Sequence, residues 1–104
     1  PLTAVGRLRF DPALFAVPGC TLAVALEAVG DVSAGGLTGT VVLYDLTANA
    51  PAATISVTST TPGNAQAVSV TVPGTPRSYE LRASLSGGTG YLTLGGAVLR
   101  LTWS

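Results

Sequence analysis

The chain has 104 residues, and only 10% of them are charged, compared with about 25% in typical soluble domains. Five arginines balance five carboxylates, and lysine and histidine are absent. This length predicts one domain, residues 1–104. Without a cationic patch we expect no nucleic-acid partner. The apolar run at residues 22–28 contains Glu27 and is too short to span a bilayer, so we expect no membrane partner.

Period-two alternation of apolar and polar residues begins in residues 3–10, where Leu8 and Phe10 share one face and Arg7 and Arg9 the other. This pattern predicts a first β-strand. A short apolar connector over residues 13–16 and a turn at 18–19 follow. Residues 21–29 then predict a second strand whose two faces are both apolar, one of them made of small residues.

The middle of the chain predicts four further strands, separated by turns rich in glycine, proline and asparagine. Tyr44 lies on the same face as Val42 in the first of them. The outward faces of the later strands carry mainly serine and threonine, with Glu80 and Arg82 together on one face as an expected ion pair. These strands are expected at residues 37–46, 52–60, 65–72 and 78–86.

A last strand is predicted over residues 91–103, and its alternation changes phase part of the way along. Leu92 and Leu94 are even-numbered, whereas Leu99 and Leu101 are odd-numbered, as is Trp103. The intervening Gly95-Gly96 pair predicts a β-bulge that returns all of these side chains to one face. Seven or eight strands in total predict an all-β fold, an antiparallel β-sandwich of the jelly-roll type.

The residues that usually carry catalysis are missing or scattered. Without histidine, neither a Ser-His-Asp nor a Cys-His arrangement is possible. The five carboxylates occur singly, and Asp31 and Asp45 lack the spacing of a calcium loop. Cys20 is expected to be a small buried residue beside a turn. We therefore expect no enzyme activity, no catalytic residues, no metal and no cofactor.

The low charge favours assembly, because a neutral domain lacks the repulsion that keeps monomers apart. A gene rich in G and C would also explain the absence of lysine. We expect the chain to form a homo-oligomer. The small apolar face of Ala23 and Ala25, together with Tyr44 and Tyr91, is the expected interface. The chain starts at Pro1 with no leader-like segment, so no signal peptide is expected.

The second half of the chain carries a family resemblance. The segments ATISVTSTTP, SYELRASLSGGTG and YLTLGGAVLRLTWS resemble the closing half of small β-sandwich domains in virion proteins of tailed bacteriophages. Those domains similarly end on a Gly-Gly kink and a final alternating strand. The resemblance implies a virion location and a role in capsid decoration or as a head or tail accessory protein, with other virion proteins as partners. It assigns no functional residue.

A second reading of the sequence is a carbohydrate-binding or adhesive module of a cell-surface assembly, located outside the cell. Such modules stack aromatic rings on sugars. Tyr44, Tyr91 and Phe15 are the aromatic residues that the strand pattern leaves outside the expected core, whereas Phe10, Tyr79 and Trp103 fall on core faces. A glycan partner would therefore require Tyr44, Tyr91 or Phe15, whereas the alternative is that these rings pack in the core or at its rim.

Overall fold

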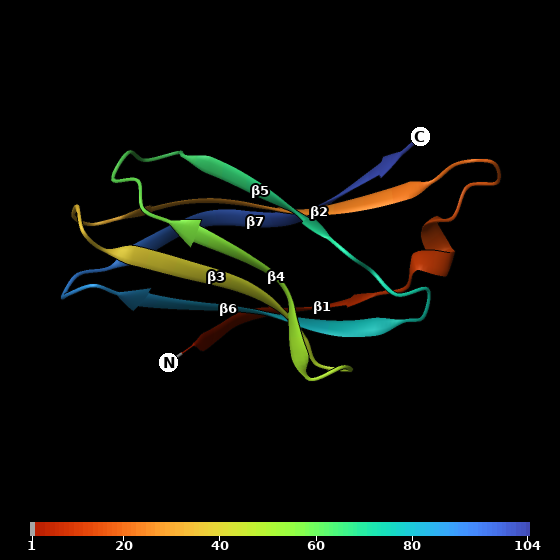
Figure 1. Cartoon of the computed structure of the whole chain (residues 1–104), viewed down its shortest axis with the longest axis horizontal. Helices are drawn as coiled ribbons and strands as arrows, with labels where there is room; N and C mark the ends of the chain where they lie inside the picture. Colours follow the sequence, from red (N-terminus) through yellow and green to blue (C-terminus); the bar gives the residue numbers. More distant parts are fainter. Residues whose placement is uncertain (1) are drawn as a thin grey trace.

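The computed structural model describes residues 2–104 as two antiparallel β-sheets packed face to face (Figure 1). The expectation about a leader at Pro1 lies outside the described residues. The predicted all-β sandwich is confirmed. Its seven strands are β1 Thr3–Phe10, β2 Leu22–Val32, β3 Thr38–Asp45, β4 Ala50–Val57, β5 Ala65–Val70, β6 Arg77–Ser86 and β7 Leu92–Trp103.

The seven predicted strands are all present, with small changes at their ends. β2 extends three residues beyond the predicted end, to Val32, and β5 stops at Val70 instead of residue 72. The apolar connector after β1 forms a short 3-10 helix, η1, over Pro12–Phe15. Asp11 caps this turn, since its carboxylate accepts a hydrogen bond of 3.0 Å from the backbone N–H of Ala13.

One sheet has the strand order β1-β6-β3-β4 and the other the order β5-β2-β7. An eight-stranded jelly roll, numbered along its chain, has the orders 2-7-4-5 and 1-8-3-6. Counting β1 to β7 as strands two to eight reproduces both orders, with β7 as strand eight. Within residues 2–104, no strand takes the first position, which lies next to β7.

The core lies between the sheets and is built from alternate residues of the central strands. Leu26, Val41, Val57 and Tyr79 are fully buried there. In β2, for example, Val24, Leu26, Ala28 and Val32 are buried, which follows the period of two that places every second side chain on one face of a strand. Burial of this apolar layer is the main stabilising term for a chain without a disulfide.

The predicted bulge in the last strand is confirmed at Gly95. Val29 of β2 pairs with Gly96, and the next residue of β2, Gly30, pairs with Leu94, so that Gly95 is the additional residue. The bulge brings Leu94 and Leu99 to the same inner face despite their odd separation in sequence.

Two burial predictions are wrong. Trp103 was expected in the core but is 42% exposed, because β7 continues past the region that the other sheet covers. Its indole N–H donates a hydrogen bond of 2.7 Å to the Phe15 carbonyl oxygen. Cys20 was expected to be buried but is exposed, because it lies in the connection ahead of β2 and not in a sheet.

Candidate functional site

A groove of about 830 Å³ lies between β1 and β7 and leads into the space between the sheets. The residues that line it are mainly apolar. They include Leu8 of β1, Leu81 of β6, and Leu94, Leu99 and Leu101 of β7. Apolar concave surfaces of this kind are the usual binding sites of proteins.

The groove exists because one sheet has four strands and the other has three. β4 and β5 contact each other and close one side of the sandwich. On the other side, β1 extends beyond β7. Phe10 and Leu8 both face inward on β1, but Phe10 is 4% exposed and stacks on Phe15, whereas Leu8 is 42% exposed. The inner face of β1 is therefore only partly covered.

A second candidate surface is the arginine–tyrosine cluster on the outer face of the four-stranded sheet, formed by Arg7, Tyr44, Asn49, Glu80 and Arg82. The Glu80 carboxylate accepts hydrogen bonds from Arg7 Nε at 3.1 Å and Arg82 Nε at 2.7 Å. The Arg82 guanidinium lies 3.7 Å from the centre of the Tyr44 ring, a cation–π contact. Tyr44 Oη donates a hydrogen bond of 2.8 Å to Asn49 Oδ1.

These contacts determine the protonation of Glu80. The hydrogen bond from Arg82 is the largest influence on the pKa of Glu80 and lowers it below its ordinary value. Burial of the carboxylate opposes this effect, and Arg7 adds to the lowering. The predicted Glu80–Arg82 ion pair is confirmed, and Glu80 is held in its charged form between two arginines.

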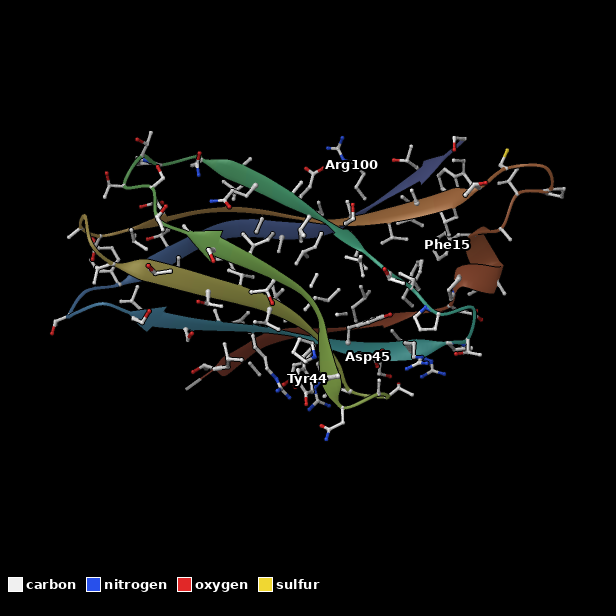
Figure 2. All side chains as sticks on the ribbon, in the orientation of Figure 1. Phe15, Tyr44, Asp45 and Arg100 are labelled. Atoms are coloured by element: carbon white, nitrogen blue, oxygen red, sulfur yellow. The ribbon has the colours of Figure 1, made fainter. Side chains whose placement is uncertain are left out.

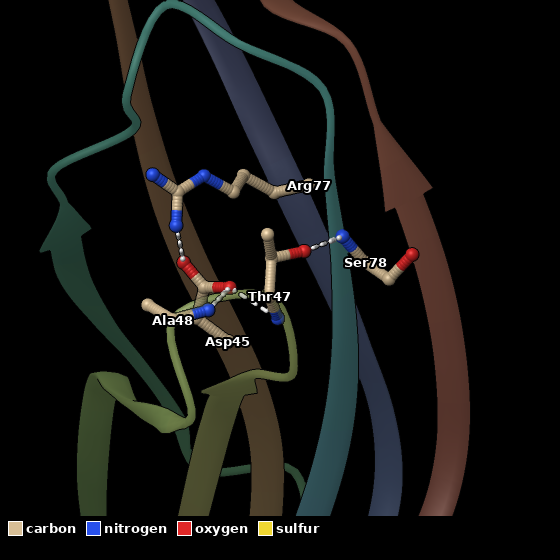
Figure 3. A network of polar contacts seen from close by, with 5 residues as sticks. All are labelled: Asp45, Thr47, Ala48, Arg77 and Ser78. Carbon is tan, nitrogen blue, oxygen red and sulfur yellow. Dashed lines mark hydrogen bonds and ion pairs between the residues drawn. The ribbon is translucent and has the colours of Figure 1, made fainter.

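A third polar cluster fixes the turn between β3 and β4 to the start of β6 (Figure 3). Asp45 Oδ1 accepts hydrogen bonds of 2.9 Å from the backbone N–H groups of both Thr47 and Ala48. Asp45 Oδ2 accepts one of 3.1 Å from Arg77, and Thr47 Oγ1 accepts one of 3.2 Å from the Ser78 N–H. Both oxygens of this buried carboxylate are therefore occupied by donors within the chain.

The expected interface residues Ala23 and Ala25 lie on β2, on the outer face of the three-stranded sheet. Ala23 pairs with Thr102 of β7 and is exposed, whereas Ala25 pairs with Arg100 and is partly buried. Arg100 donates a hydrogen bond of 3.1 Å to Glu27, the next outward residue of β2. The small apolar face is thus real but narrow, and an ion pair lies beside it.

The four expected interface residues do not form one surface. Tyr44 and Arg100 point away from the sandwich on opposite faces (Figure 2), so Tyr44 lies on the face opposite Ala25, the pairing partner of Arg100. Tyr91 is 66% exposed in the connection between β6 and β7, where its N–H donates a hydrogen bond of 2.9 Å to Ser33 Oγ.

Sequence reasoning missed the groove. Leu8, Leu99 and Leu101 were correctly predicted to face inward, but an inward direction does not say whether another strand lies opposite. The odd number of strands could have indicated the groove, because seven strands cannot form two sheets with the same number of strands. Within residues 2–104 there is no group of three or more cysteine or acidic side chains that could hold a metal, and no helix that could cross a membrane.

We predict that Asp45→Ala lowers the free energy of unfolding by about 2–4 kcal/mol, because it leaves Arg77 and two backbone N–H groups without their buried acceptor. Asp45→Asn should cost less, since its amide oxygen still accepts the turn bonds. Asp11→Ala is the matched control, because Asp11 accepts one backbone bond at an exposed position. It should cost about 1 kcal/mol or less. Equal losses for Asp45→Ala and Asp11→Ala in urea unfolding would contradict this role.

The lowered pKa of Glu80 should make the stability of the folded chain depend on pH. Because its pKa is lower in the folded chain, its contribution to stability is complete above the ordinary carboxyl pKa of about 4.3 and decreases as the pH falls through the folded value. The melting temperature should therefore fall below about pH 4, and Glu80→Gln should remove much of that fall. Glu27→Gln, the same change on the opposite sheet, serves as the control. Parallel melting curves against pH for the wild type and Glu80→Gln would refute this assignment.

No model of a known protein family matches the chain, no curated protein matches its sequence, and no solved structure matches its fold.

Proposed function

We propose that this chain is a non-catalytic virion structural protein, a capsid decoration or head or tail accessory protein. It assembles with copies of itself and with other virion proteins through protein–protein contacts. The observation that carries the proposal is the character of the surface: its charges are mostly neutralised within the chain, while large apolar side chains are exposed. Both features suit a subunit that is covered after assembly.

Most charged side chains are paired with each other within the chain. Four of the five arginines form ion pairs with carboxylates of the same chain, namely Arg7, Arg77, Arg82 and Arg100. Paired charges are weak long-range attractors for charged ligands, and they leave the surface without strong repulsion between copies. Three of the five carboxylates, Glu27, Asp45 and Glu80, take part in these pairs. A carboxylate held in an ion pair is better suited to a structural role than to proton transfer in catalysis.

The large exposed hydrophobic side chains are concentrated in a few parts of the chain. Most of the large hydrophobic residues that are exposed lie in three places: on β1 and β7, in the connector between β1 and β2, and in the connection before β7. They are Leu2, Val5, Leu8, Leu14, Phe15, Val17, Tyr91, Val98 and Trp103. The strands that border the groove thus also carry much of the uncovered apolar surface. Interface cores are enriched in such aromatic and aliphatic residues and depleted in charge.

The experiment is to purify particles of the virus whose genome carries this gene and to quantify the chain by mass spectrometry against the major capsid protein. We expect a fixed ratio between the two in intact particles, and immunogold labelling at regular positions on them. Particles that lack the chain after purification, with the chain recovered only from the host cell envelope, would refute the virion assignment.

The second candidate function, a carbohydrate-binding or adhesive module, is favoured by one observation, the 66% exposed ring of Tyr91. Tyr44 is a poorer sugar platform, because Arg82 lies over its ring. On a glycan array, this function predicts binding that Tyr91→Ala abolishes and Tyr44→Ala leaves within about twofold. An array without signal would eliminate this candidate.

A further inference from the structure

We propose that the groove between β1 and β7 binds a single extended strand of a partner polypeptide, with apolar side chains at every second position. This strand adds to the free edge of β7 as an eighth strand of the sandwich. The inference rests on the proposed function, because it names the kind of partner segment through which the chain assembles. It uses β-strand addition, in which backbone hydrogen bonds provide affinity and side-chain pockets provide selectivity.

The topology indicates where the strand binds. The observed sheet orders are those of an eight-stranded jelly roll whose first strand would pair with β7 and face β1. β7 pairs with β2 on one side, and among residues 2–104 it has no strand on the other. Half of its backbone groups therefore point away from β2, and an added strand would supply their partners.

The walls of the groove indicate the chemistry of the strand. Leucines from β1, β2, β3, β6 and β7 are the commonest side chains that line the groove, and Phe10 and Phe15 line it as well. Small residues, among them Gly6 and Ala97, are also part of the lining. Arg7 and Arg9 border the groove, but their guanidinium groups are bonded to Glu80 and Ser78 on the outer face. The inward side chains of the partner strand must therefore be apolar and uncharged. Its outward side chains face solvent and are free to be polar.

The position of β1 beyond β7 argues against a second copy joined edge to edge. Pairing of β7 with β7 of another copy would extend the three-stranded sheet symmetrically. The four-stranded sheet of each copy reaches past its own β7 to β1. The projecting edges of the two four-stranded sheets would then occupy the same space. One lone strand fits beside β7 and covers Leu8, and all seven strands of residues 2–104 already have places in the two sheets.

The test uses a synthetic peptide of four valines alternating with three threonines, flanked by two lysines at each end. Amide hydrogen exchange of the full chain is measured with and without it. We expect the amides of β7 that exchange quickly in the free chain to slow at least tenfold with 1 mM peptide. A control peptide with proline in place of all four valines and all three threonines should have no effect, because proline lacks the N–H that a strand must donate, whichever set of N–H groups faces β7.

Leu8→Asp should weaken peptide binding at least tenfold, because it places a carboxylate against the bound strand. Leu14→Asp is the matched control: Leu14 is 78% exposed, lies outside the groove and should leave binding within twofold. Leu8→Thr retains a β-forming residue and should weaken binding to a smaller extent, which keeps the test usable if the aspartate variant unfolds.

A peptide of generic sequence binds weakly, so a second experiment fuses the same peptide to the chain ahead of Pro1. The linker is a glycine–serine segment of about 20 residues, which spans about 25 Å. The fusion raises the effective concentration of the peptide at the groove. We expect the melting temperature to rise by about 5 °C or more over the proline-containing fusion.

Unchanged β7 exchange together with equal melting temperatures of the two fusions would overturn the proposal. A dimeric free chain with β7 already protected would also overturn it, since a second copy would then cover the groove. If strand addition fails this test, the proposed presence of the chain in virions still stands, because the chain could attach to the particle through another surface. The two proposals can therefore fail separately.

Discussion

When two sheets pack face to face, a side chain is buried only where the opposite sheet covers it. This constraint determines which apolar residues of the chain are enclosed and which are exposed. Three strands cannot cover four. On the side where β4 meets β5 the apolar residues are enclosed, whereas on the other side the inner face of β1 extends past β7 and Leu8 is left half exposed next to the buried Phe10. The groove, the bare edge of β7 and much of the uncovered apolar surface all follow from this difference of one strand.

The distribution of charge is a second consequence of the same architecture. On the outer faces of both sheets, antiparallel register places arginines opposite or diagonal to carboxylates, as with Arg7 opposite Glu80 and Arg100 close to Glu27. Seven of the ten charged side chains of this chain take part in such ion pairs. The exposed surface also carries large apolar side chains, and exposed apolar patches are typical of interaction sites. Intramolecular charge pairing and the open groove are the two features on which the proposed assembly rests.

The sequence predicted the strands well because each has a clear period of two, and it predicted the Gly95 bulge because the leucines of β7 change phase there. It could not predict the groove, since the inward direction of Leu8 says nothing about the strand opposite. It also could not place Tyr44 under Arg82, a contact that depends on the register between β3 and β6. Trp103 was misjudged for a related reason: alternation continues to the end of a strand, whereas burial ends where the other sheet ends.

The groove and the proposed strand addition both require that the β7 edge is open in the isolated chain. The most direct measurement is residue-resolved amide hydrogen exchange of the free chain at micromolar concentration, comparing β7 with β2, which pairs on both sides. We expect protection along the whole of the paired part of β2 but only at alternate residues of β7, whether the chain is a monomer or is joined to other copies through another surface. Continuous protection along β7 in the free chain would contradict it.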